Sequence, residues 1–244
     1  MNPADVRPKE SPTGLGDYQQ SPLLWYCKRV LRWQSEIAPV KMWRGKAVEA
    51  GLVYAAHHKC ELSDAVTEAE MVFDIESDHS KEAEEEKKAV AKYVAAGYEY
   101  FARLDIVSTQ QKHVLDFGLP IVLRGFSDLE TADEIHEIKS TERMPRSAET
   151  ISPGHKYQAA CYGTAAGKPC RLSYVSPKGE LVQYVLSEEI IADTLAEMQH
   201  TLRAICKTIE VAKDEKDLLE FLSPQFASFY WDADLRHKAR RLIA

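Results

Sequence analysis

The fold of this chain is decided by residues 123–141, which read LRGFSDLETADEIHEIKST. Two short runs in and around this stretch, 120–129 and 134–140, have the composition of β-strands, and turn-forming residues separate them. A third run of this kind, 106–117, comes before them and is followed by Gly118 and Pro120. The sequence therefore predicts three consecutive strands joined by short turns.

Helical patterns lie on both sides of these strands. Helices are expected from Ser21-Pro22, over 42–58, from about 80 to 104, over 153–166 and along the tail from residue 188. Two further strands, 171–176 and 181–186, flank a Pro- and Gly-containing turn. This order predicts an α/β fold in which a central mixed β-sheet is flanked by helices.

The expected domain organisation is one domain behind a short leader. Proline and glycine recur in residues 1–20, which we interpret as a flexible leader. Residues 21–244 are expected to form a single domain with a core at 21–186 and a C-terminal helical part at 187–244. A chain of 244 residues that is 45% hydrophobic can bury a core of this size.

Composition excludes several classes of protein. The chain has no apolar run long enough for a transmembrane helix, so no membrane partner is expected. Its start lacks the basic and apolar stretches of a secretory signal, and a cytoplasmic location is therefore expected. The five cysteines contain no Cys-x-x-Cys pair, which argues against a zinc site or a redox pair and favours reduced thiols.

Charge is segregated along a chain whose net charge is −7. Residues 28–46 hold six basic residues and one acidic one, and residues 139–178 hold seven basic residues and two acidic ones. Between these blocks, residues 61–88 hold eleven acidic residues and three basic ones. Two basic blocks can form a positive groove on one face, while the acidic stretch is expected to be a solvated surface.

The chemistry of the chain is expected on two adjacent predicted strands. Asp128 would stand near Glu137 and Lys139, which share a strand face because strand side chains alternate. Two converging carboxylates form a hard-oxygen site suited to Mg²⁺ or Mn²⁺. A lysine beside them can hold an attacking water or offset phosphate charge, and burial can lower its pKa. These groups together meet the needs of metal-assisted phosphodiester hydrolysis.

A structural alternative to this site is an exposed, ion-paired strand edge, since Asp-x8-Glu-x-Lys arises by chance in many proteins. Other residues favour the functional interpretation. Gln158 and Tyr162 are four residues apart on the helix after the strand, and so lie on one helix face. Upstream, Gly45 and Glu49 are also four residues apart on a predicted helix.

In this order and spacing the motifs of residues 21–186 resemble the PD-(D/E)XK nuclease superfamily, and within it the RecB-like and lambda-type exonuclease branch. The resemblance implies a restriction-endonuclease-like core and a Mg²⁺ or Mn²⁺ ion. It implies metal ligation by the carboxylates of Glu49, Asp128 and Glu137 and by the carbonyl of Ile138. Small stand-alone members are frequent in bacteriophages, so the resemblance also points to a phage source and to a host cytoplasm.

The resemblance assigns the remaining roles as well. Lys139 would assist the attacking water, and Gln158 and Tyr162 would contact DNA or brace the site. Arg44, next to the family glycine, is a candidate clamp for a terminal 5′-phosphate through its fork of donors. Residues that follow the metal-binding strand are candidate phosphate contacts: Ser140, Thr141, Arg143 and Lys156.

Two departures from the family pattern matter. Ser127 replaces the proline before the strand aspartate, which the family tolerates. RecB-like members often use a histidine as the first ligand, which leaves His57 as an alternative to Glu49, although the Gly-x3-Glu match favours Glu49. Some CRISPR-associated relatives hold an iron–sulfur cluster, but Cys161, Cys170 and Cys206 are spaced too widely for that pattern, and no cluster is expected.

The first expectation is therefore a metal-dependent exonuclease on duplex DNA ends, serving recombination, replication or repair. The alternatives are a structure-selective or restriction-like endonuclease and, from another class, an inactive DNA-binding or assembly protein. Ring-shaped assembly is known for lambda-type relatives, and the partners considered besides DNA are a second copy of the chain, in a homo-oligomer, and a single-strand annealing protein. The sequence leaves oligomeric state, digestion polarity, the preference for duplex or single-stranded ends and the preferred ion open.

Overall fold

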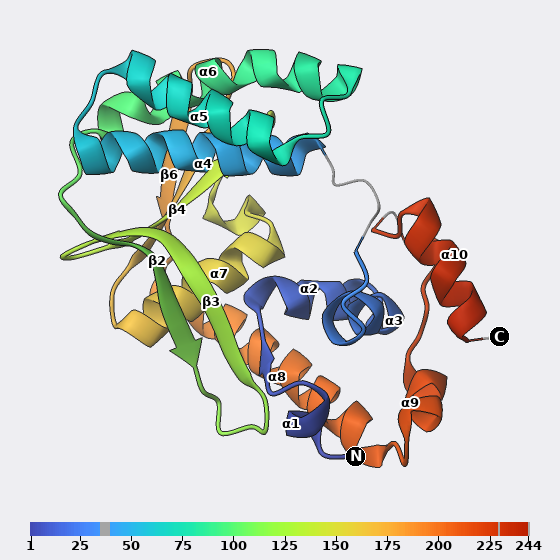
Figure 1. Cartoon of the computed structure of the whole chain (residues 1–244). Coiled ribbons are helices and arrows are strands. Elements are labelled where there is room, and N and C mark those ends of the chain that lie inside the picture. The colour runs from blue at the N-terminus through green and yellow to red at the C-terminus, as the bar shows by residue number, and fades with distance from the viewer. Residues whose placement is uncertain (35–39, 229, 244) are drawn as a thin grey trace.

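Our computed structural model describes residues 1–34, 40–228 and 230–243 of the chain. Its centre is a six-stranded β-sheet. The strands are β1 (Lys9–Glu10), β2 (Ile106–Leu115), β3 (Val122–Thr131), β4 (Ile135–Ser140), β5 (Cys170–Val175) and β6 (Leu181–Val185). The predicted α/β class, with a central mixed sheet between helices, is confirmed (Figure 1).

The sheet is organised around β3. β2 pairs with β3 in the antiparallel direction over most of its length. On the other edge of β3, β1 pairs in parallel with its start and β4 pairs antiparallel with its end. β4 and β5 are parallel neighbours, which require a crossover connection, and α7 (Pro153–Ala166) supplies it. β6 completes the sheet as the antiparallel neighbour of β5.

Three helices form a layer on one side of the sheet: α4 (Val40–His58), α5 (Leu62–Glu76) and α6 (Lys81–Phe101) (Figure 1). Their apolar side chains bury one another and the sheet residues Leu129 and Ile138. Gly51 allows α4 and α5 to approach closely, because a Cβ there would lie 2.6 Å from the carbonyl oxygen of Ala65. Helix α5 was not predicted, since exposed Met71 and Ile75 interrupt its apolar stripe.

The second core lies among the sheet, α7 and the helices at both chain ends. It includes α2 (Pro12–Gln20), α3 (Pro22–Trp25), the π-helical turn Tyr26–Val30 and α8 (Glu188–Val211). The predicted tail helix continues into α9 (Glu215–Phe221) and, beyond the expected break near Ser223-Pro224, α10 (Ala233–Leu242). None of the described helices has the length and apolarity to span a bilayer.

The first twenty residues differ from the expected flexible leader. They form the short helix α1 (Pro3–Val6), β1 and α2, and Leu15 is fully buried. Glu10 is also buried, and its carboxylate accepts hydrogen bonds from Arg7 Nε and from Trp25 Nε1, each at 2.6 Å. Pairing of β1 with β3 and this buried polar contact hold the segment against the sheet.

Candidate functional site

Asp128 and Glu137 lie side by side at the point where β3 and β4 separate. The registered pairing of these strands covers only Leu129 and Glu130 of β3. Beyond it, the Ile138 amide donates to Asp128 Oδ2 at 2.6 Å, and the Asp128 amide donates to Glu137 Oε1 at 3.3 Å. Both carboxylates are buried, with residue exposures of 7% and 1%. Side-chain acceptors thus continue the contact between the two strands after the ladder ends.

Lys139 adds a positive charge to this pair of acids. Its Nζ donates to Glu137 Oε2 at 2.7 Å, from two residues along the same strand. Burial alone would lower the pKa of Lys139, but the carboxylates of Glu137, Asp128 and Glu49 outweigh burial and raise it. The expectation that burial lowers this pKa is therefore wrong, and the amine is a charged hydrogen-bond donor.

Glu49 enters the site from α4, on the helical layer. It hydrogen-bonds to the carboxylate of Asp128, and Gln110 Nε2 on β2 donates to Glu49 Oε1 at 2.8 Å. His57 is exposed and stacks near His58, about 12 Å along α4 from Glu49 at the rise of a helix. The structure thus brings Glu49, and not His57, to Asp128.

The three acids hold their protons more tightly than ordinary carboxylic acids. Burial is the largest cause for each, and repulsion from the neighbouring carboxylates adds to it for Glu49 and Glu137. The pKa of Glu49 rises to about 8 and that of Glu137 to about 7. The pKa of Asp128 also rises, although Lys139 and the Ile138 amide oppose the shift. One ammonium group therefore does not offset the two buried carboxylates of Asp128 and Glu137 together with the half-buried one of Glu49.

This charge imbalance and the chemistry of the oxygens fit a divalent cation. Carboxylate oxygens are the ligands that Mg²⁺ and Mn²⁺ prefer. Across the described residues, no three His, Cys, Asp or Glu side chains already stand as a metal-ligand set. Lys139, Gln110 and the Ile138 amide each donate to one oxygen of an acid, which leaves the other oxygen of each carboxylate without a donor from these three groups. The Ile138 side chain is buried in the helical-layer core.

Gln158 and Tyr162 lie on the same face of α7, as their spacing predicts. Gln158 hydrogen-bonds to Tyr162 and lines a groove between α7 and α2. Tyr162 is buried at 3% exposure; burial raises its pKa, and the Glu137 carboxylate raises it further, which places the ring near that acid. A Cβ at Gly125 of β3 would lie 2.4 Å from the Tyr162 hydroxyl. Such close packing favours bracing, of the two roles expected for Tyr162.

A buried polar network supports Tyr162 from β2. The ring of His113 stacks on Tyr162 with a centroid distance of 5.3 Å. Its Nε2 lies 2.9 Å from Glu130 Oε1 and 3.0 Å from the hydroxyl of Ser127. Lys168 Nζ approaches the other Glu130 oxygen at 3.7 Å. His113 was not identified from the sequence, because its partners lie on β3 and α7 and no local motif marks it.

Gln110 was also missed, although its contact with Glu49 is direct. Its φ of 50° places a non-glycine residue in the left-handed region on a strand. Such a conformation costs about 1–3 kcal/mol and is concentrated at functional sites. The sequence gives no signal for this backbone conformation, since glutamine has no preference for it.

Arg44 does not lie free to clamp a phosphate. It is buried at 4% exposure, and its guanidinium packs over the Tyr93 ring at 4.7 Å. Nη1 pairs with Glu86 and, at 3.4 Å, with Glu142, while Nε donates to the Ser140 hydroxyl at 3.3 Å. The charge of Arg44 is thus neutralised by Glu86 and Glu142, and the Ser140 hydroxyl accepts a hydrogen bond from the Arg44 guanidinium.

The other candidate phosphate contacts lie between β4 and α7. Thr141 closes a turn, since its hydroxyl accepts from the Arg143 amide at 3.1 Å, and Arg143 itself is exposed. Lys156 is half-buried and donates to the Glu149 carbonyl at 2.8 Å. Nδ1 of His155 is hydrogen-bonded to the Tyr174 hydroxyl at 2.9 Å. Burial lowers the pKa of His155, and the positive charge of the nearby Lys139 lowers it further.

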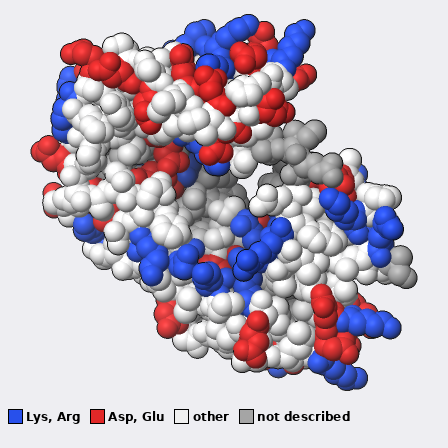
Figure 2. Space-filling view, in the orientation of Figure 1, with Lys and Arg blue, Asp and Glu red and all other residues white. Residues whose placement is uncertain are grey.

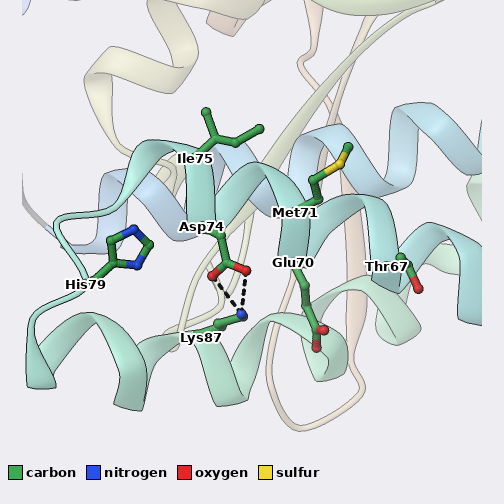
Figure 3. A pocket seen from close by; sticks show the side chains of 7 residues that line it. All are labelled: Thr67, Glu70, Met71, Asp74, Ile75, His79 and Lys87. Carbon is green, nitrogen blue, oxygen red and sulfur yellow. Dashed lines mark hydrogen bonds and ion pairs between the residues drawn. The ribbon is translucent and has the colours of Figure 1, made fainter.

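A surface hollow on the helical layer lies apart from these acids. Figure 3 shows it between α5 and α6, with Met71 and Ile75 on one side. Lys87 Nζ there contacts both oxygens of Asp74, at 2.6 and 2.7 Å. None of the candidate site residues lines this hollow.

Comparisons with known proteins give a family and a fold. A family profile described as the PD-(D/E)XK nuclease superfamily matches residues 9–240. A putative exonuclease from Eubacterium rectale shares the fold at a TM-score of 0.63 and 12% identity, over 96% of this chain and 90% of that one. An alkaline exonuclease from Laribacter hongkongensis superposes at a TM-score of only 0.44 and 14% identity, over 85% and 92% of the two chains. No curated protein matches the chain.

Proposed function

The chain belongs to the PD-(D/E)XK nuclease superfamily, and from this membership we propose that it is a Mg²⁺- or Mn²⁺-dependent deoxyribonuclease that degrades duplex DNA from its ends. The observation that carries the proposal is the meeting of Glu49, Asp128 and Glu137 beside the amine of Lys139. Three acids from α4, β3 and β4 have no structural need to share a buried site, because their repulsion costs stability.

The proposed mechanism gives each of these groups a role. Glu49, Asp128 and Glu137 would hold the cation, together with the carbonyl of Ile138. A bound divalent cation supplies Lewis-acid polarisation of a phosphoryl oxygen and stabilises the charge that develops there. Lys139, held by Glu137, donates hydrogen bonds that orient the attacking water or offset charge on the phosphate.

The surroundings of the acids support DNA as the substrate. Gln158 lines a groove between α7 and α2, and it is hydrogen-bonded to Tyr162, whose ring lies near Glu137. Exposed Arg143 follows β4 and the half-buried Lys156 lies in the first turn of α7, and both can neutralise phosphates. A role in recombination, replication or repair, a single-strand annealing partner and assembly into a homo-oligomer belong to the same proposal.

An endonuclease is the alternative within the same chemistry, and an inactive DNA-binding protein is the alternative outside it. The retained Asp128, Glu137 and Lys139 favour an active enzyme over the latter. Linear duplexes labelled at the 5′ or the 3′ end are incubated with Mg²⁺, with Mn²⁺ and with chelator, alongside covalently closed circles. An exonuclease degrades the linear DNA only, and an endonuclease also cuts the circle. Binding without cleavage in either metal would contradict the enzymatic proposal.

A further inference from the structure

The long hairpin of β2 and β3 presents two different faces. His113 and Gly125 form a cross-strand pair on the inward face, against Tyr162 of α7. Lys112 pairs with Phe126 and Val114 with Arg124, so alternation places these four side chains together on the outward face. We call these four residues the hairpin face.

The hairpin face is exposed and carries positive charge only. Phe126 and Val114 are exposed by 44% and 45%, and Lys112 is exposed as well. Neither Lys112 nor Arg124 has a carboxylate partner among the described residues, whereas Arg44 and Lys139 are both paired. On a chain with a net charge of −7, these two cations and the exposed apolar side chains beside them form a patch suited to a negatively charged partner.

The arrangement of the four side chains suits a nucleic-acid strand. Diagonal cross-strand neighbours such as Lys112 and Arg124 lie about 7–8 Å apart, so the two can reach separate phosphates. The guanidinium of Arg124 lies over one side of the Phe126 ring at 5.4 Å. The ring is therefore held in place with much of its surface open, as an aromatic side chain is when it stacks on a base.

The hairpin face lies next to the proposed site along both strands. Asp128 is two residues beyond Phe126 on β3, and Gln110, which contacts Glu49, is two residues before Lys112 on β2. Figure 2 shows Lys and Arg side chains gathered across the middle of the molecule, over the hairpin and the adjoining N-terminal helices. DNA that reaches the acids can thus extend over the hairpin without meeting a carboxylate of this face.

We propose that the hairpin face binds the DNA substrate outside the bond to be cleaved, with Lys112 and Arg124 on phosphates and Phe126 against a base or sugar. This inference rests on the proposed nuclease function and adds a substrate track to it. We assign DNA and not a second protein as the ligand, because the phosphates of DNA are complementary in charge to Lys112 and Arg124.

The test measures the affinity of labelled duplex DNA in chelator, by fluorescence anisotropy, between about 50 and 200 mM salt. The double variant Lys112→Gln/Arg124→Gln is expected to weaken binding at low salt by tenfold or more. Its slope of log affinity against log salt should fall by about two, one for each phosphate that the variant no longer neutralises. Phe126→Ala should weaken binding with little change in slope, since it carries no charge.

A matched control removes two cations elsewhere. Lys81→Gln/Lys92→Gln changes the net charge equally on exposed positions of α6, and it should leave affinity and slope near those of the natural chain. Cleavage of saturating DNA in Mg²⁺ is measured on every variant, together with the melting temperature and the elution volume in size exclusion.

The outcomes separate this inference from the function on which it rests. If the hairpin variants bind DNA like the α6 control while Mg²⁺-dependent cleavage persists, the hairpin inference is wrong and the nuclease proposal stands. Lys112→Gln/Arg124→Gln can instead aggregate while its monomeric fraction binds DNA like the natural chain. In that case the two cations only prevent aggregation through the edge strand β2, and the hairpin inference is also wrong. If the natural chain does not cleave DNA, the nuclease proposal fails, whatever the hairpin binds.

Discussion

The backbone amide of Ile138 donates a 2.6 Å hydrogen bond to the carboxylate of Asp128. The amide of Asp128 in turn donates to Glu137 at 3.3 Å. These bonds lie just beyond the point where the registered pairing of β3 and β4 ends. Where the backbone ladder of β3 and β4 ends, hydrogen bonds from backbone amides to carboxylates still connect the two strands. The same hydrogen bonds hold Asp128 and Glu137 next to each other. Each carboxylate is buried by the fold and oriented by the backbone of the other strand.

Metal affinity should depend steeply on pH around neutrality. The raised pKa values of Glu49, about 8, and of Glu137, about 7, mean that both acids hold protons that a ligated cation must displace. Lowering the pH from about 9 to about 6 should therefore weaken Mg²⁺ binding, and binding should release protons. Calorimetry in buffers of different ionisation enthalpy measures both effects. A Mg²⁺ affinity that stays constant over this pH range would contradict the raised pKa values of Glu49 and Glu137.

Gln110 should matter more for activity than for stability. Replacing it by glycine removes the amide that holds Glu49, and at the same time relieves a left-handed backbone conformation. Gln110→Gly is expected to lower the cleavage rate about tenfold, with a free energy of unfolding that changes by less than about 1 kcal/mol. Urea unfolding and initial rates check the two parts. An equal loss of rate and stability would show that Gln110 is only structural.

Arg44 is expected to stabilise the fold instead of recognising a phosphate. Arg44→Gln removes the cation that pairs with Glu86, leaves Glu142 with Lys41 only, and removes the packing over Tyr93. Because Glu86 and Glu142 remain partly exposed, the expected loss is about 1–3 kcal/mol of unfolding free energy. A clamp would behave differently, since its loss would abolish any preference for 5′-phosphorylated over 5′-hydroxyl ends at unchanged stability.

The brace around Tyr162 can be tested by adding one methyl group. Gly125→Ala would place a Cβ within 2.4 Å of the Tyr162 hydroxyl, so the ring must move. Overpacking of this kind costs about 1–3 kcal/mol, and displacement of a ring beside Glu137 should reduce cleavage as well. Gly125→Ala/Tyr162→Leu removes the hydroxyl and the two ring carbons that clash and should recover part of the stability. No recovery would show that Tyr162 is not what Gly125 accommodates.

The sequence predicted those parts of the fold and site that depend on local patterns. The shared strand face of Glu137 and Lys139, and the four-residue spacing of Gln158 and Tyr162, can be read over short windows, and the structure keeps them. What was missed depends on distant partners. Arg44 meets Glu86 from another helix, and Glu10 meets Trp25 after the chain has turned back on itself. No local window contains both members of such a pair.

The proposed site is tested most directly by the cleavage of end-labelled linear duplex DNA in Mg²⁺ by the natural chain and by Asp128→Asn, Glu137→Gln and Lys139→Ala. The natural chain should release nucleotides, and each variant should be at least about 100-fold slower. Because burial disfavours the ionised forms of Asp128 and Glu137, their amide variants should melt no lower than the natural chain. Full Mg²⁺-dependent cleavage by any of the three would contradict the assignment of these residues to the active site.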